Sequence, residues 1–119
     1  MDRYDLKRRT KEFAHQCVKF TTSLPNTKLG NHIERQLIRC ATSVAANYRA
    51  VLLAQSDASF AAKLSIVIEE VDECDFWIEF ALDENITSSE YASPIMKEAK
   101  ELTAIFIASR KTIQLRNKK

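Results

Sequence analysis

The sequence predicts an all-α fold, an antiparallel up-down-up-down four-helix bundle formed by a single domain over residues 1–119. Only one glycine and two prolines occur in the chain, and 45% of its residues are apolar. β-Sandwiches and barrels need turn residues about every 8–12 positions, so they are disfavoured. Apolar residues instead recur at alternating steps of three and four, which places them on one face of a helix. A chain of this length can bury a continuous core without disulfides or a metal.

The first half of the chain contains two predicted helices separated by one proline. The first is expected over residues 2–22 and ends before the stretch SLPNT at 23–27. Pro25 lacks an amide hydrogen and restricts the residue before it, so a helix cannot run through this stretch. The second helix is expected over residues 28–54.

The second half contains two more helices of similar length. The third is expected over residues 57–83, where Ser56 can cap the first turn and Asp57 favours the helix dipole. The fourth is expected over residues 89–116, and its Pro94 falls in the first turns, where a missing amide is tolerated. Short links make consecutive helices antiparallel, as in an up-down-up-down bundle.

The stretch RCATSVAANYRA in the second predicted helix carries polar residues among small ones. The apolar stripe places Asn47 on the core-facing seam, with Ser43 one turn before it. In one interpretation Asn47 is buried and hydrogen-bonded to a neighbouring helix, where it fixes register or oligomeric state. In the other it lies at the edge of the seam and touches water. The small side chains around it let another helix approach closely, which favours the buried Asn47.

Three short motifs follow one another along the second and third predicted helices. They are an arginine and small residues leading to S-V-x-x-N, then S-x-x-x-F-x-x-K-L, then E-x-x-[DE]-x-x-x-W. Their residues are Arg39, Ser43, Val44 and Asn47; Ser56, Phe60, Lys63 and Leu64; and Glu69, Asp72 or Glu73, and Trp77. In this order they resemble the four-helix-bundle proteins encoded in intervening sequences of bacterial 23S rRNA genes. Many members carry an acidic residue two or three positions after the asparagine, where this chain has Arg49.

The resemblance implies an antiparallel bundle that assembles as a ring, commonly a homopentamer. No enzymatic activity is established for the family. A related branch, the accessory variability proteins of diversity-generating retroelements, binds nucleic acid and a reverse transcriptase. The residues expected to specify structure or oligomeric state are Arg39, Ser43, Asn47, Ser56, Phe60 and Trp77.

Aromatic residues form a second apolar face on the third predicted helix. Phe76, Trp77 and Phe80 lie beside its core stripe. One core requires only one apolar face, so either the fourth helix covers both faces or one of them contacts another subunit. A subunit contact is the favoured interpretation.

Charge is distributed unevenly along a chain whose net charge is only +2. Ten of the eighteen Lys and Arg residues lie near the two termini, Lys118 and Lys119 among them, whereas residues 64–96 contain none. The start of the first helix and the end of the fourth share one end of such a bundle, so that end is predicted to be basic. It could hold a phosphate backbone without reading sequence; alternatively, these residues only maintain solubility and complement the fourth helix's dipole. The nucleic-acid contacts predicted on this basis are Arg3, Lys7, Arg8, Arg9, Lys11, Arg49, Arg110, Lys111 and Arg116.

No catalytic, metal or cofactor site is predicted. Cys17, Cys40 and Cys74 fall on apolar faces without a C-x-x-C pair, which indicates reduced core thiols. In the acidic run EEVDECD at 69–75, Glu69 and Glu73 are expected to share one face with Trp77, while Glu70 and Asp72 point elsewhere. Paired carboxylates can act as general acids or bases, but a solvated or arginine-paired face is favoured here.

The sequence therefore predicts a non-catalytic module that forms a homo-oligomer and binds RNA or DNA through its basic end. The alternative is a scaffold that holds another protein through its acidic face or its Trp77 face, and an enzyme using Glu69, Glu73 or Asp72 ranks third. The charged N-terminal stretch lacks a signal peptide, and no apolar run approaches the roughly 20 residues that span a bilayer. A cytoplasmic protein without membrane contact is expected.

Overall fold

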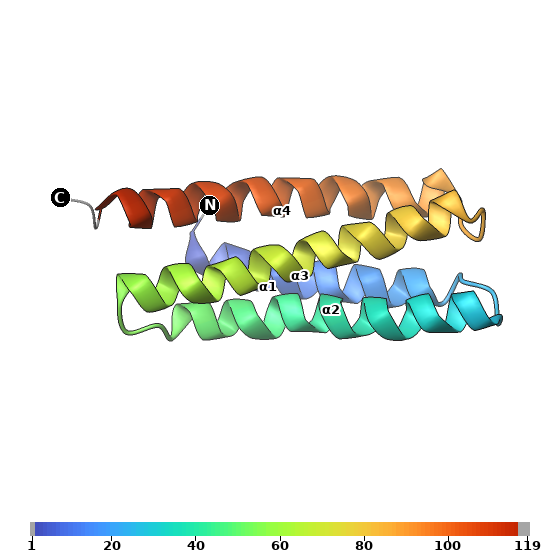
Figure 1. Cartoon of the computed structure of the whole chain (residues 1–119), viewed down its shortest axis with the longest axis horizontal. Helices are drawn as coiled ribbons and strands as arrows, with labels where there is room; N and C mark the ends of the chain where they lie inside the picture. The colour runs from blue at the N-terminus through green and yellow to red at the C-terminus, as the bar shows by residue number, and fades with distance from the viewer. Residues whose placement is uncertain (1, 117–119) are drawn as a thin grey trace.

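The computed structural model describes residues 2–116 as a bundle of four α-helices. They are α1 (Arg3–Thr21), α2 (Lys28–Leu52), α3 (Asp57–Asp83) and α4 (Ser89–Arg116). Figure 1 shows consecutive helices running in opposite directions along a body that measures 52 × 21 × 20 Å. The predicted all-α four-helix fold is confirmed.

The helix ends lie close to their predicted positions because local capping defines them. α3 and α4 have the predicted bounds, α1 is one residue shorter at each end, and α2 ends at Leu52 rather than at residue 54. Asp2 forms a capping box at the start of α1. The hydroxyl of Thr27 accepts a hydrogen bond from the Gly30 amide at 3.0 Å, and Ser56 caps α3 as predicted.

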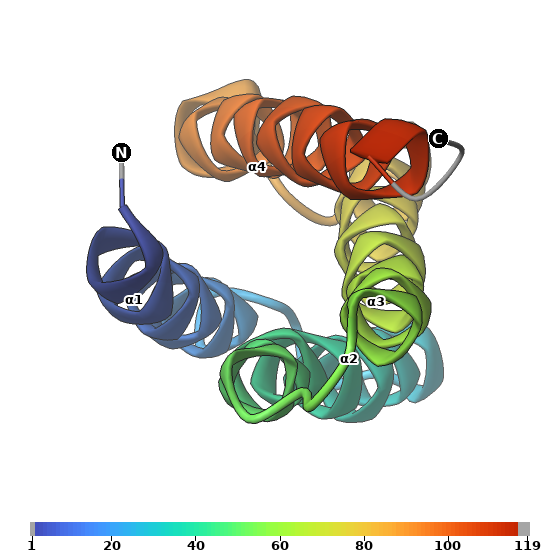
Figure 2. The same ribbon diagram turned by 90° about the vertical axis from the view of Figure 1, so that its left-hand side faces the viewer.

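The four helices surround one core, but they do not contact one another equally. Each helix packs along its length against the next one in the chain, whereas α1 contacts α4 much less, and Figure 2 shows these two helices farther apart. The largest fully buried side chains include Phe13 of α1, Leu37 of α2, Leu64 of α3 and Phe106 of α4. Every helix therefore contributes a buried stripe, as the spacing of apolar residues predicts.

Tyr48, and not Asn47, faces the core from the last two turns of α2. Tyr48 is only 2% exposed, and its ring stacks on Phe106 of α4 with the centroids 5.4 Å apart. Asn47 is half-buried, and its amide donates to the Ser43 carbonyl at 2.9 Å and to the Ser43 hydroxyl at 2.8 Å, within the same helix. The predicted hydrogen bond from Asn47 to a neighbouring helix is therefore wrong. Burying an aromatic ring here is more favourable than burying an amide.

The three cysteines meet inside the bundle. Cys17, Cys40 and Cys74 are free and fully buried, which agrees with the prediction of core thiols. The Cys74 thiol donates to the Cys40 sulfur at 3.2 Å, and the Cys40 thiol donates to the Leu37 carbonyl at 3.6 Å. These sulfurs pack as small apolar groups with weak hydrogen bonds.

Candidate functional site

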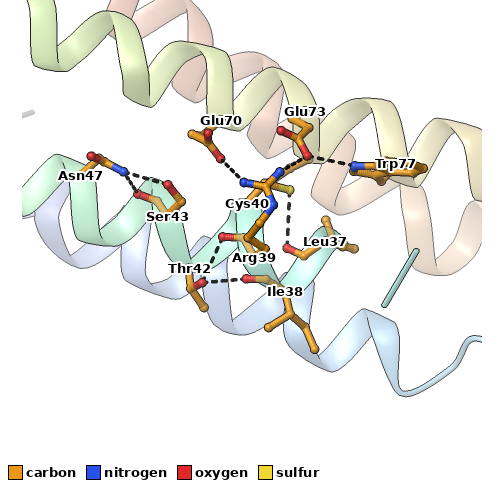
Figure 3. Close-up of polar contacts among 11 residues, drawn as sticks. Leu37, Ile38, Arg39, Cys40, Thr42, Ser43, Asn47, Glu70, Glu73 and Trp77 are labelled. Carbon is orange, nitrogen blue, oxygen red and sulfur yellow. Dashed lines mark hydrogen bonds and ion pairs between the residues drawn. The ribbon is translucent and has the colours of Figure 1, made fainter. Parts of the chain in front are cut away.

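Residues of the first and third sequence motifs meet between α2 and α3. Figure 3 shows Arg39 of α2 directed at two carboxylates of α3. Its guanidinium forms ion pairs with Glu73 and, at 3.4 Å, with Glu70. The indole N–H of Trp77 donates to the Glu73 carboxylate at 3.1 Å. An arginine, two carboxylates and a tryptophan therefore form one connected polar cluster across the two helices.

Glu70, and not Glu69, completes this cluster. Glu69 and Asp72 are exposed, whereas Glu70 is half-buried and lies against Arg39. The prediction that Glu70 points elsewhere is wrong. α3 presents to α2 the flank that contains positions 70 and 77, which are two turns apart, and position 69 is rotated from it by one residue towards solvent. Spacing from Trp77 alone could have indicated either carboxylate.

The cluster favours the ionised form of Glu73. The hydrogen bond from Arg39 holds the pKa of Glu73 below its ordinary value, and the Trp77 N–H acts in the same direction. The Glu73 hydrogen bond in turn raises the pKa of Arg39. A general acid near neutral pH needs a carboxyl group whose pKa is raised. The electrostatics of this site are therefore those of a structural ion pair.

An aromatic patch continues from the cluster onto the outer face of α3. The Trp77 ring lies 5.0 Å from Phe76 and 5.3 Å from His32 of α2, measured between centroids, and Phe80 lies 5.9 Å from Phe76. Phe76 is 51% exposed, and Ile66 on the same helix is 44% exposed. α4 thus leaves part of the second apolar face of α3 uncovered.

The second motif has a structural role at the start of α3. The Ser56 hydroxyl accepts the Ser59 amide at 3.1 Å. Phe60 packs against the core, and the guanidinium of Arg3 lies over its ring, 5.2 Å from the centroid. One predicted nucleic-acid contact, Arg3, is therefore engaged in a cation–π interaction with α3.

The predicted basic end is only partly available for a ligand. Arg9 of α1 forms ion pairs with Glu98 at 2.5 Å and Glu101 at 2.7 Å, both on α4. These hydrogen bonds raise the pKa of Arg9. Arg8 pairs more loosely with two carboxylates of its own helix, each at 3.7 Å. Arg9 is thus a link between α1 and α4.

Two arginines near the end of α4 hold that helix against α3. Arg116 pairs with Asp57 at 2.7 Å, and Arg110 donates to the Ser65 hydroxyl at 3.0 Å. Lys111 is exposed and has no carboxylate within 4 Å among residues 2–116. The predicted basic residues Lys118 and Lys119 lie outside the described residues.

Three of the predicted basic residues converge on one groove between α1 and α2. Lys7 and Lys11 of α1 and Arg49 of α2 line a groove of about 490 Å³. The rest of its lining, which we call its floor, is mostly small and apolar; it consists of Ala14, Val18, Ala45 and Ala46, together with His15 and Thr42. No carboxylate in the described part of the chain lies within 4 Å of any of the three cations. The groove is the place where basic residues of the predicted set are brought together without internal partners.

Between residues 2 and 116, no group of three or more His, Cys, Asp and Glu side chains is arranged so that it could hold a metal ion. None of the four described helices combines the length and the apolar character needed to cross a membrane.

Sequence and fold comparisons agree on the relatives of this chain. The sequence model of the 23S rRNA-intervening sequence proteins matches residues 3–108. This protein belongs to that family. The crystal structure of a protein of unknown function from the S23 ribosomal protein family of Bacteroides thetaiotaomicron is similar to this family member, with a TM-score of 0.81 and 30% sequence identity. The similarity covers 88% of this chain and 97% of that one. No curated protein matches.

Family membership confirms the resemblance inferred from the three motifs. In this family member, Arg39 and Trp77 are joined through Glu73, so two of the motifs describe one tertiary cluster. Sequence reasoning missed Glu70 and Tyr48, although each lies one residue from a position that it selected. The sequence does not indicate that Lys7, Lys11 and Arg49 share a groove, because these residues come from two helices that only the fold brings together.

Proposed function

We propose that this protein is a non-catalytic module that binds the phosphate backbone of RNA or DNA through the groove between α1 and α2. One observation carries the proposal: Lys7, Lys11 and Arg49 line a single groove, and no carboxylate of the described chain lies within 4 Å of them. Cations without internal partners can replace the counterions of a phosphate backbone. Arg9 and Arg116, which pair with carboxylates of the bundle, are assigned a structural role instead.

The proposal includes self-association, with a ring-shaped homopentamer as the expected arrangement. The support is the outer face of α3, where Phe76 is exposed in ring contact with the half-buried Trp77 and Phe80. A contiguous exposed apolar patch marks an interaction surface. A ring would also bring several basic grooves together and strengthen binding to a long polyanion.

A second candidate function uses the same patch differently. If the Trp77 face holds an unlike protein, this chain is a scaffold rather than a nucleic-acid-binding protein. The exposed Phe76 favours such a contact as much as it favours a second copy. An enzymatic role has less support, because the lowered pKa of Glu73 is opposite to what a general acid needs.

Nucleic-acid binding is tested by fluorescence anisotropy with a labelled RNA hairpin and a DNA duplex at low and near-physiological salt. Affinity should fall steeply with salt, and replacing Lys7, Lys11 and Arg49 by Gln should lower it by about tenfold or more at low salt. The matched control replaces three exposed lysines near the end of the bundle that holds the link between α1 and α2, namely Lys19, Lys28 and Lys97, by Gln. Both variants remove the same charge. No binding of a duplex or of a single strand at low salt, or an equal loss in both variants, would refute the proposal.

Self-association is tested by light scattering. The protein should have a mass that is a multiple of the 13.6 kDa chain, and Phe76→Glu should reduce that mass by placing a charge in the interface. Tyr91→Glu changes another exposed aromatic residue, on α4, and should leave the mass unchanged. A wild-type mass equal to one chain at all concentrations would argue against the ring. That result would favour the second candidate function, in which the aromatic patch on α3 binds an unlike protein.

A further inference from the structure

We propose that the groove between α1 and α2 takes a single strand of nucleic acid in preference to a duplex, and that Tyr4 stacks on one of its bases. The inference rests on the nucleic-acid binding proposed above and names the class of ligand. Three features carry it: the concave shape of the groove, its apolar floor, and an exposed aromatic ring beside its cations.

The shape of the groove suits one strand. Proteins that read a duplex insert a protruding helix or ribbon into the major groove. Here the cations lie on the two walls of a hollow between helices, with Lys7 and Lys11 on one wall and Arg49 on the other. A concave cationic channel that follows the backbone is typical of proteins that bind single strands.

The floor of the groove suits a strand whose bases are unpaired. Ala14 and Val18 of α1 and Ala45 and Ala46 of α2 present small apolar groups between the cations. Phosphates can pair with the cations on the rim, while sugars and base faces pack on the floor. In a duplex the base faces are stacked inside the helix and cannot reach such a floor.

Tyr4 supplies a ring for stacking. It is 79% exposed and makes no ring contact within residues 2–116. It lies three positions before Lys7 and seven before Lys11, so the three side chains lie along one side of α1. Exposing a tyrosine so fully serves no packing purpose in the described structure. Next to a cationic groove it forms the aromatic element that sequence-tolerant single-strand binding requires.

Charge complementarity selects a polyanion as the occupant of the groove. An acidic helix of a protein partner would also match the cations, but it would leave Tyr4 without a role. Polyglutamate is therefore added as a competitor in the experiment. If the groove binds acidic protein segments, polyglutamate should displace the labelled strand.

The test measures anisotropy of a short labelled oligothymidylate and of a DNA duplex of equal length at low salt. The single strand should bind about tenfold more tightly than the duplex. Tyr4→Ala should weaken single-strand binding by about fivefold or more, Tyr4→Phe should retain it because the ring remains, and duplex binding should change in neither variant. Tyr91→Ala, at an exposed tyrosine of α4 that does not line this groove, is the control and should have no effect.

The outcomes separate this inference from the proposed function. Equal affinity for strand and duplex, or no effect of Tyr4→Ala, would overturn the single-strand assignment while leaving nucleic-acid binding intact. No binding of either probe at low salt would overturn both. Displacement of the strand by polyglutamate at equal charge, without any strand preference, would assign the groove to an acidic protein segment and overturn the inference. Circular dichroism of each variant checks that the bundle is intact.

Discussion

Arg39 of α2 and Trp77 of α3 hydrogen-bond to the same carboxylate oxygen of Glu73, the indole at 3.1 Å. The ion pair between two helices thus also fixes the orientation of the tryptophan ring. That ring is in edge contact with the exposed Phe76, 5.0 Å away between centroids. The polar cluster and the exposed aromatic patch are therefore parts of one arrangement, and changing Arg39 should affect both.

The Arg39–Glu73 pair should make stability depend on pH. Because the folded state lowers the pKa of Glu73 below its ordinary value of 4.5, the carboxylate contributes stability that is fully present above pH 4.5. That contribution is lost as the pH falls through the lower pKa of the folded state. Urea unfolding between pH 7 and pH 3 should show this loss.

Arg39→Ala should reduce that pH dependence, leaving the part due to the Trp77 N–H, and should lower the free energy of unfolding at pH 7 by about 1 kcal/mol, since the pair is partly exposed. Arg8→Ala, which breaks only loose pairs on the surface of α1, is the control and should change stability little. An Arg39→Ala protein with the wild-type pH profile would show that Glu73 does not depend on this partner.

Arg9 should be a main determinant of the contact between α1 and α4. These helices pack less closely than the other neighbours, and Arg9 reaches two carboxylates of α4 from a largely buried position. Arg9→Ala should cost about 2 kcal/mol, because it leaves Glu98 partly buried without its partner. Arg9→Lys should recover only part of this, because lysine lacks the bidentate fork. Hydrogen exchange should rise first in α1; an unchanged exchange rate there would contradict the assignment.

Gly30→Ala should destabilise the protein, although helix propensity alone predicts a gain of about 1 kcal/mol. A Cβ at this position would lie 2.0 Å from the backbone oxygen of Pro25 and 3.2 Å from the Thr27 hydroxyl. Backbone oxygen cannot move aside without shifting the link between α1 and α2, so we expect a loss of about 2 kcal/mol or more. Lys28→Ala, at an exposed position in the same first turn of α2, is the control and should change the Tm little. Thermal unfolding shows whether Gly30→Ala lowers or raises stability. A raised Tm would mean that the link between α1 and α2 shifts at little cost in free energy.

The three thiols should be unreactive until the protein unfolds. Hydrogen bonding with Cys74, together with burial, raises the pKa of Cys40, and hydrogen bonding with Cys17, together with burial, raises the pKa of Cys74. Thiolate is the reactive form, so a disulfide reagent should modify the native protein slowly even at pH 9 and all three cysteines rapidly in denaturant. Fast labelling of the folded protein would mean that the core opens near these residues.

The helices themselves could be predicted from sequence because their causes are local. α3 and α4 begin and end as expected, since capping residues and the three-four spacing of apolar side chains lie within each segment. The family resemblance was likewise carried by motifs within two adjacent helices. The spacing of apolar residues could not decide whether Asn47 or Tyr48 faces the core, because neighbouring positions on a helix are only about 100° apart around its axis. The choice between them depends on Phe106, which lies 58 residues further along the chain.

The charge pattern shows the same difference between what the local sequence specifies and what the tertiary structure decides. The sequence by itself determined that basic residues gather near both termini. The up-down order of the four helices, which short links predict, brings these two segments towards one end of the bundle. Only the tertiary structure decided which of the basic residues remain available for a ligand. The partners of Arg9 lie 89 and 92 residues away in sequence, and the groove joins Lys7 and Lys11 to Arg49 of another helix. Periodicity specifies which face of a helix is buried, but the pairing of one charge with another depends on distances between helices that no local pattern contains.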